Sequence, residues 1–195
     1  AYFDTLLQCG ALEVLFPEVH ALLGVEQPAK HHPEIDTYIH VMMCVDLAAK
    51  SGASPEQVFA ALVHDLGKGI TPKEMIPHHY GHEEEGVPLV DAMCDRLKIP
   101  NTFRWLGSNV SRYHLNVHTS MSLNAKTLTN KLISMGALQN YNRFLSLLEV
   151  CKYDARGRLG LEDREYPQEQ FMINAAKVLK SLSYKDLAAK YQNAK

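Results

Sequence analysis

The stretch SPEQVFAALVHDLGKG, residues 54–69, shows most directly how this chain folds. Ser54 and Gln57 are spaced as the two partners of a capping box, with Pro55 in the first turn between them, so a helix is predicted to begin here. Gly67 is predicted to stop this helix after about residue 66. Four apolar residues recur at helical spacing and form its predicted buried face: Val58, Ala61, Leu62 and Leu66.

His64 and Asp65 lie at the end of this apolar face, where two ionisable neighbours need an explanation. Consecutive residues of a helix point about 100° apart, so two neighbours can bracket a single atom near the helix end. Burying an isolated carboxylate is costly, whereas a carboxylate that coordinates a metal ion is compensated. A metal ion also needs more than two protein ligands. The pair therefore predicts a buried metal site to which other segments contribute.

His40 and Asp154 are the other candidate ligands. His40 lies on a predicted helix over residues 37–50, and antiparallel packing against the next helix would bring it close to His64. Asp154 continues the buried face of a predicted helix over residues 139–154. Two imidazoles and two carboxylates form a mixed nitrogen and oxygen donor set, which suits Mg²⁺, Mn²⁺, Ni²⁺, Co²⁺ or Fe²⁺.

Helical periodicity runs through nearly the whole chain without convincing period-two alternation, so the fold is predicted to be all-α. Asp36, Asn101 and Asn124 are predicted N-caps. The predicted helices cover residues 3–16 (a short pair ended by Pro17), 37–50, 55–66, 84–98, 102–116, 124–136, 139–154 and 167–181. The proline- and glycine-rich segment ITPKEMIPHHYGHEEEG is predicted to be a loop.

One domain is expected over residues 31–182, with a helical lead-in over 1–30 and a helical tail over 183–195. The 195 residues, 46% of them hydrophobic, suffice for one sizeable core. The net charge of -2 gives no overall basic field, so binding to bulk RNA is not predicted. No apolar run is long enough to cross a bilayer and the first residues lack signal-peptide features, so the chain is expected to be cytoplasmic. The four cysteines lack CxxC spacing and are expected to be reduced core thiols.

The ordered set His40, His64, Asp65 and Asp154 matches an H…HD…D signature and resembles the HD-domain metal-dependent phosphohydrolases, in which these residues ligate a divalent metal. Four segments also resemble the C-terminal HD region of the bacterial multifunctional CCA proteins, which are tRNA nucleotidyltransferases: EVLFPEVHALLGVEQPAKHHPEIDTYIHV, HDLGKG, HHYGHEEEG and KYDARGR. The resemblance covers nearly the whole chain. It implies an HD-domain helical bundle with a buried metal site that holds Mg, Ni or Mn.

The same resemblance implies a hydrolytic enzyme. The implied activities are those of a 2′,3′-cyclic phosphodiesterase, a 2′-nucleotidase and a phosphatase, acting on nucleotides or tRNA 3′-end phosphates in tRNA repair and processing. The glycine-rich strand-loop and paired aspartates of a nucleotidyltransferase head do not occur in the 195 residues, so CCA addition is not predicted for them. That head is instead an expected partner domain in the full-length protein. The sequence leaves open whether the chain forms a homodimer.

Two other functions remain compatible with the sequence. An HD-type phosphohydrolase of dNTPs or cyclic dinucleotides would use the same metal ligands, and only the flanking resemblance argues against it. A non-catalytic tRNA-binding module would retain the HD residues as structure. That module would need a basic face, which the net charge of -2 does not favour.

Asp65 and Lys68 are the predicted catalytic residues. Asp65 would be a ligand or a base, while Lys68 would either contact substrate phosphate or complete the dipole of a helix end, and the sequence does not separate these roles. His82 and His114 are suited to the second metal site of two-metal HD families, or to phosphate contact and proton donation. His118 is interpreted as a surface histidine. Three arginines are predicted to bind phosphate: Arg112, Arg156 and Arg158.

Overall fold

The computed structural model describes residues 2–29 and 33–182, and in these ranges it confirms the all-α prediction. Extended pairing within them is limited to one isolated bridge between Glu26 and Asp36. The predicted helical tail over 183–195 lies outside the described residues. The elements are α1 (Tyr2–Gln8), α2 (Ala11–Leu15), α3 (Pro17–His20), α4 (Thr37–Lys50), α5 (Pro55–Val63), η1 (Leu66–Ile70), η2 (Lys73–Met75), α6 (His82–Leu97), α7 (Asn101–His118), η3 (Ser120–Ser122), α8 (Ala125–Ser134), α9 (Tyr141–Arg156) and α10 (Pro167–Ser181).

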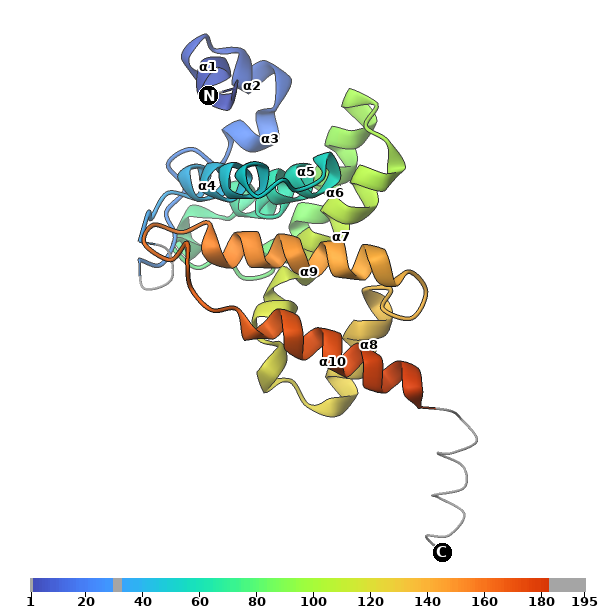
Figure 1. Ribbon diagram of the computed structural model, residues 1–195. Coiled ribbons are helices and arrows are strands. Elements are labelled where there is room, and N and C mark those ends of the chain that lie inside the picture. The colour runs from blue at the N-terminus through green and yellow to red at the C-terminus, as the bar shows by residue number, and fades with distance from the viewer. Residues whose placement is uncertain (1, 30–32, 183–195) are drawn as a thin grey trace, which may run out of the picture.

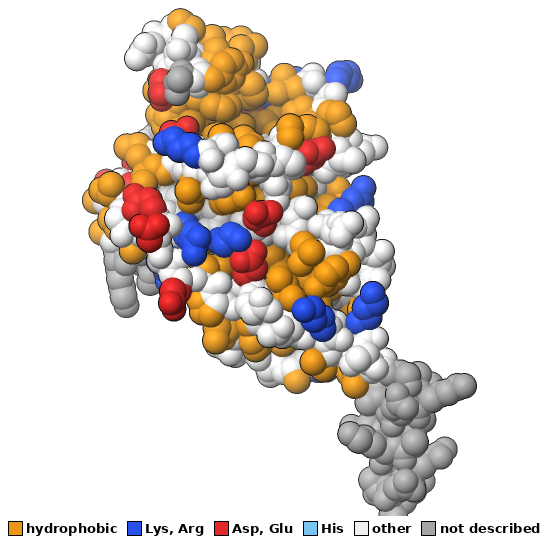
Figure 2. Space-filling model, viewed as in Figure 1, with side chains coloured by type: hydrophobic (Ala, Val, Ile, Leu, Met, Phe, Trp, Pro, Cys, Tyr) orange, Lys and Arg blue, Asp and Glu red, His pale blue; other side chains and the backbone are white. Residues whose placement is uncertain are grey.

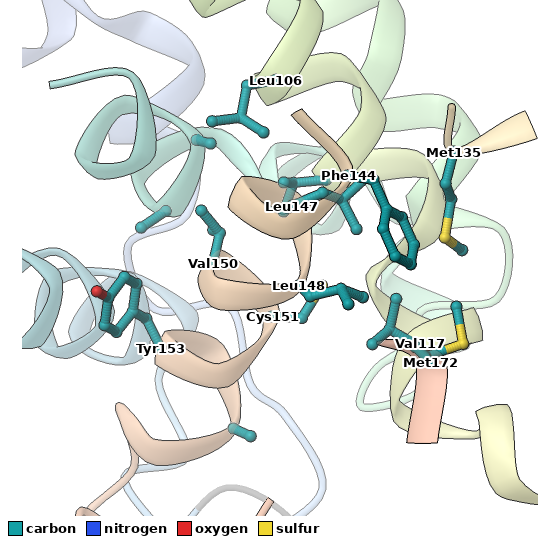
Figure 3. Packing of buried hydrophobic residues seen from close by; sticks show 14 of the residues in the cluster. Leu106, Val117, Met135, Phe144, Leu147, Leu148, Val150, Cys151, Tyr153 and Met172 are labelled. Atoms are coloured by element: carbon teal, nitrogen blue, oxygen red, sulfur yellow. The ribbon is translucent and has the colours of Figure 1, made fainter. Parts of the chain in front are cut away.

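The helices pack around α5, which contacts α4, α7 and α9 (Figure 1). The core centres on α9, whose apolar stripe faces residues of α7, α8 and α10 (Figure 3). Its fully buried members include Phe144, Leu147, Leu148 and Cys151. Burial of each Phe or Leu side chain contributes about 1.5–3 kcal/mol relative to exposure. This packing fixes α9, and therefore also the end of α9 that carries Asp154.

Three of the four predicted N-caps are confirmed by cap hydrogen bonds. The Asp36 side chain accepts a hydrogen bond from the backbone N–H of Ile39, and Asn124 caps α8 in the same way. Ser54 opens α5 with both halves of its capping box formed. Asn101 is not a cap, because it is the first residue of α7 and Pro100 precedes it without a side-chain cap bond.

The end of α5 and the role of Gly67 differ from the prediction. The helix ends at Val63, and His64 and Asp65 form the turn before the 3₁₀ helix η1. Gly67 lies within η1, where a Cβ atom would overlap the carbonyl oxygen of His82 and approach the backbone N of Gly86 to 2.8 Å. The glycine is therefore required by close packing of η1 against α6, rather than by a helix end.

Two further features near helix ends differ from the prediction. The predicted short helix pair does end before Pro17, at Leu15, but Pro17 then begins the unpredicted helix α3, because its fixed φ and missing N–H are tolerated in a first turn. The acidic residues expected to begin a helix at residue 84 instead lie in the first turn of α6, which begins at His82. Within the segment predicted to be entirely loop, η2 adds one short 3₁₀ turn.

A second close approach joins α4 to the end of α9. A Cβ atom at Gly157 would lie 2.6 Å from the Cys44 sulfur and 2.8 Å from the Cys44 backbone N. Absence of a side chain at Gly157 therefore lets the end of α9 approach α4 closely. Both segments meet at the same end of the helix bundle (Figure 1).

The N-terminal helices share a core with the rest of the bundle. Leu12, Val19 and Leu22 are fully buried in a cluster with residues of α4, α5 and α6. Figure 2 shows many hydrophobic side chains on the outer surface of this N-terminal region, which includes exposed Tyr2 and Val14. Within the described ranges, no helix combines the length and apolarity needed to cross a membrane. The predicted boundary at residue 30 stays a prediction.

Candidate metal centre

The four predicted ligands converge at one buried site. His40 comes from α4, His64 and Asp65 from the turn after α5, and Asp154 from the last turn of α9, and none is more than 3% exposed. The Nε2 atom of His40 lies 3.1 Å from Oδ1 of Asp154, and Nε2 of His64 lies 3.2 Å from Oδ2 of Asp65. Between the two pairs, Nε2 of His40 lies 3.9 Å from Oδ2 of Asp65, and Nε2 of His64 lies 3.8 Å from Oδ1 of Asp154. The structure therefore brings the four residues together, while their role as ligands stays a prediction.

Hydrogen bonds at the far side of each ring orient the two imidazoles. Nδ1 of His64 donates to the carbonyl oxygen of Ala61 at 2.8 Å, and Nδ1 of His40 lies 3.0 Å from a carboxylate oxygen of Glu34. A neutral imidazole that donates from Nδ1 has its lone pair on Nε2. Both Nε2 atoms are thus turned toward Asp65 and Asp154, in the orientation of metal-binding histidines.

The polar atoms at the centre of this cluster fit a divalent cation. Among the described residues, Nε2 of His64 and Oδ1 of Asp65 are buried atoms without a hydrogen-bond partner. A nitrogen lone pair facing a carboxylate oxygen is repulsive and costly inside a protein unless a proton or a metal cation lies between them. Cys44 is a further possible ligand at this cluster, since its sulfur lies 3.6 Å from Nε2 of His40.

A second group of donors adjoins the first and shares Asp65 with it. Oδ1 of Asp65 lies 3.3 Å from Nε2 of His82 and 3.6 Å from Nε2 of His114. Nδ1 of His82 donates to the His79 carbonyl oxygen, and Nδ1 of His114 donates to that of Ser111, so both Nε2 lone pairs face the carboxylate. The structure therefore brings the two predicted accessory histidines into the site.

The electrostatic environment keeps the carboxylates ionised. Burial alone would raise the pKa of Asp65, but the neighbouring His64 and Lys68 outweigh it and hold this pKa well below its usual range. Burial likewise opposes ionisation of Asp154, whose pKa is held well below its usual range by His118 and Arg158. Burial lowers the pKa of His114 to about 3, so this imidazole is neutral and able to coordinate a metal.

The predicted basic residues divide into two groups. Lys68 is buried, with Nζ 2.7 Å from Oδ2 of Asp65, and it donates to Gln27 at 2.6 Å, so it faces the site rather than a helix end. Arg158 also belongs to the site, because its Nη2 atom lies 3.0 Å from Oδ1 of Asp154.

The other two arginines lie apart from the cluster. Arg112 is partly exposed and pairs with Glu84 on α6, and Arg156 donates to the backbone carbonyl of Arg164. Both therefore take partners outside the set of predicted ligands.

Two residues of the site were not predicted from the sequence. His118 is not a surface histidine: its Nε2 atom donates to Oδ2 of Asp154 at 2.5 Å, and its Nδ1 atom accepts from the hydroxyl of Tyr166 at 2.8 Å. Its spacing could have indicated this position, since His118 follows His114 by four residues and therefore lies on the same face of α7. Glu34 gave no such signal, because it precedes α4 in an irregular segment.

A cavity of about 580 Å³ opens beside the cluster. Its lining includes Lys68, His82, His118 and Arg158, so it reaches both the cations and the histidines of the site. This volume lies within the range of cavities that hold small organic ligands. Of the two donor groups, this lining includes only His82 directly, whereas Lys68, His118 and Arg158 are side chains that contact Asp65 or Asp154.

The HD domain model matches residues 37–154, which include every predicted metal ligand from His40 to Asp154. The chain belongs to the HD-domain family. It is similar to proteins named "Multifunctional CCA protein": it is 44% identical to that of Teredinibacter turnerae over 96% of this chain and 46% of the relative. The identity is 46% for Acinetobacter baylyi, over 99% of this chain and 47% of the relative, and 49% for Cupriavidus metallidurans, over 89% and 42%.

The chain thus spans less than half the length of these curated relatives. Family membership and the buried histidine and aspartate donors together support a metal-dependent phosphohydrolase with a divalent metal site.

Proposed function

We propose that this HD domain hydrolyses 2′,3′-cyclic and 2′-phosphorylated nucleotides, including such groups at tRNA 3′ ends, with a divalent metal held by His40, His64, Asp65 and Asp154. The observation that carries the proposal is the buried His64 Nε2 atom, which faces ionised carboxylates without a hydrogen-bond partner among the described residues. Nickel, manganese and magnesium all accept these nitrogen and oxygen donors.

The bound ion would supply Lewis-acid activation of water and of the phosphoryl group. The chain's own residues then bind and orient the substrate. Lys68 and Arg158 line the cavity and place positive charge beside the carboxylates, where they attract a phosphate group. His118 donates to Asp154 and thereby fixes the orientation of that carboxylate. His82 and His114 would hold a second ion with Oδ1 of Asp65.

A substrate panel tests the proposed specificity. The purified chain, loaded in turn with Ni²⁺, Mn²⁺ and Mg²⁺, is assayed with 2′,3′-cAMP, 2′-AMP, dATP and a cyclic dinucleotide. We expect turnover of 2′,3′-cAMP and 2′-AMP, and little of the other two. Preferential turnover of dATP or the dinucleotide would replace this function by another phosphohydrolase activity. Binding of tRNA with no turnover at any metal would favour a non-catalytic module.

Lys68→Met tests whether this lysine contacts the substrate. A hydrogen bond to a charged group is worth about 1.5–3 kcal/mol, so loss of a phosphate contact should lower kcat/KM for 2′-AMP by about 10- to 100-fold. Metal affinity, measured by calorimetry, should change less because Lys68 is not a ligand. Lys73→Met changes an exposed lysine in η2 and is the matched control. An unchanged kcat/KM in Lys68→Met would restrict Lys68 to stabilising Asp65.

A further inference from the structure

Two aromatic side chains stand at the edge of the cavity without a part in the proposed chemistry. His78 and Tyr80, in the loop between η2 and α6, have nearly parallel rings with centroids 5.7 Å apart. Both residues line the cavity that Lys68 and Arg158 also line. Tyr80 is 77% exposed, so much of its ring is free of protein contact. A large apolar ring left uncovered at a cavity is a surface that a ligand can cover.

The loop that carries this aromatic pair is anchored at its centre. His79, between the two rings in sequence, is buried and donates from Nε2 to the carbonyl oxygen of Glu26 at 2.9 Å. Its Nδ1 atom accepts from the hydroxyl of Thr71 at 2.8 Å, and its own carbonyl oxygen accepts from Nδ1 of His82. These bonds tie the aromatic pair to a histidine of the candidate metal centre. The backbone between the two rings is therefore anchored beside the site.

The cavity lining combines this aromatic pair with positive charge. Lys68, Arg158 and Arg164 supply cations, and the ion pairs of the first two place them beside Asp65 and Asp154. A nucleotide has the matching combination of a phosphate and a flat aromatic base. Stacking of a base on an aromatic side chain is worth about 1–3 kcal/mol and tolerates any base, because every base has a π face.

We infer that Tyr80, stacked on His78, is the nucleobase platform of this site, and that it favours nucleotides over phosphate esters without a base while choosing little among the bases. The inference rests on the proposed function and adds its substrate-recognition residue. The Tyr80 loop offers aromatic ring faces to the cavity. It does not offer a set of buried amide groups that would hydrogen-bond to one particular base.

The experiment compares phosphate release from 2′-AMP, 2′-CMP and glycerol 2-phosphate by the metal-loaded chain. In Tyr80→Ala we expect kcat/KM for both nucleotides to fall at least about fivefold, as loss of one stacking contact predicts, and that for glycerol 2-phosphate to stay unchanged. Tyr80→Phe should retain nucleotide turnover because it keeps the ring. Tyr2→Ala, which removes another exposed tyrosine on α1, is the matched control.

Two results would overturn the inference: an equal loss for all three substrates, which indicates damage to the loop, and no loss for the nucleotides. Calorimetric titration with 2′-AMP measures binding affinity independently of turnover. If the wild-type chain hydrolyses none of the substrates, the proposed function fails, but at least fivefold weaker 2′-AMP binding in Tyr80→Ala still supports the platform. Equal binding by the two proteins, or no binding to the wild type, overturns it.

Discussion

Asp65→Asn is expected to abolish turnover of 2′,3′-cAMP while the helical fold persists. Changes to groups that merely orient a metal ligand cost about 10- to 100-fold, so loss of a ligand carboxylate should exceed the upper end of that range in kcat/KM. Asp65 is the residue with the largest expected effect, because its two oxygens face different donors. Oδ2 lies 3.2 Å from His64 Nε2, and Oδ1 lies 3.3 Å from His82 Nε2. Asparagine keeps the shape and removes the charge.

The measurement combines kinetics, metal titration and circular dichroism. Asp65→Asn should bind Mn²⁺ or Ni²⁺ more weakly by calorimetry and retain its far-ultraviolet spectrum. Asp46→Asn makes the same chemical change at an exposed carboxylate of α4 and should leave both activity and metal binding intact. Chelation of the wild-type chain should abolish activity, and the added metal should restore it. Undiminished turnover in the chelated protein would rule out the metal mechanism.

The burial of the candidate metal ligands was predictable because their sequence signals are local. His64 and Asp65 stand at the end of an apolar face, and Asp154 extends another, so burial could be inferred for each before any partner was known. The structure adds the orientation of the rings. That orientation depends on Glu34 and on the Ala61 carbonyl oxygen, neither of which a hydrophobic pattern identifies.

The basic residues show why the rest of the site was harder to predict. Arg156 and Arg158 look equally suitable in the sequence because both follow Asp154 closely. In the structure Arg156 donates to the backbone carbonyl of Arg164, whereas Arg158 pairs with Asp154 one helical turn before it. His118 turns inward because α9 and the segment before α10 supply Asp154 and Tyr166 as partners. The partner that each of these side chains takes depends on its tertiary neighbours, and it leaves no periodic signal along the chain.

Gly67→Ala is the substitution with the largest expected effect on stability. A Cβ atom at this position would overlap the His82 carbonyl oxygen and lie 2.8 Å from the Gly86 backbone N. These are backbone atoms, so no side chain can rotate away, and η1 and α6 must separate. Inserting a methyl group into a packed interior typically costs about 1–3 kcal/mol, and here we expect the free energy of unfolding to fall by at least about 3 kcal/mol. Urea denaturation measures this change.

The same substitution should also weaken metal binding, because η1 follows Asp65 directly while α6 begins with His82. Gly160→Ala is the appropriate control. Gly160 has a φ of +75°, and a Cβ atom there would meet no atom within 4 Å, so its replacement costs only the left-handed backbone penalty of about 1–2 kcal/mol. A smaller loss in Gly67→Ala than in Gly160→Ala would contradict the close-packing role of Gly67. Because Gly67 packs the segment that follows Asp65 against the helix that begins with His82, its substitution should lower both stability and metal affinity, whereas Gly160→Ala should lower only stability.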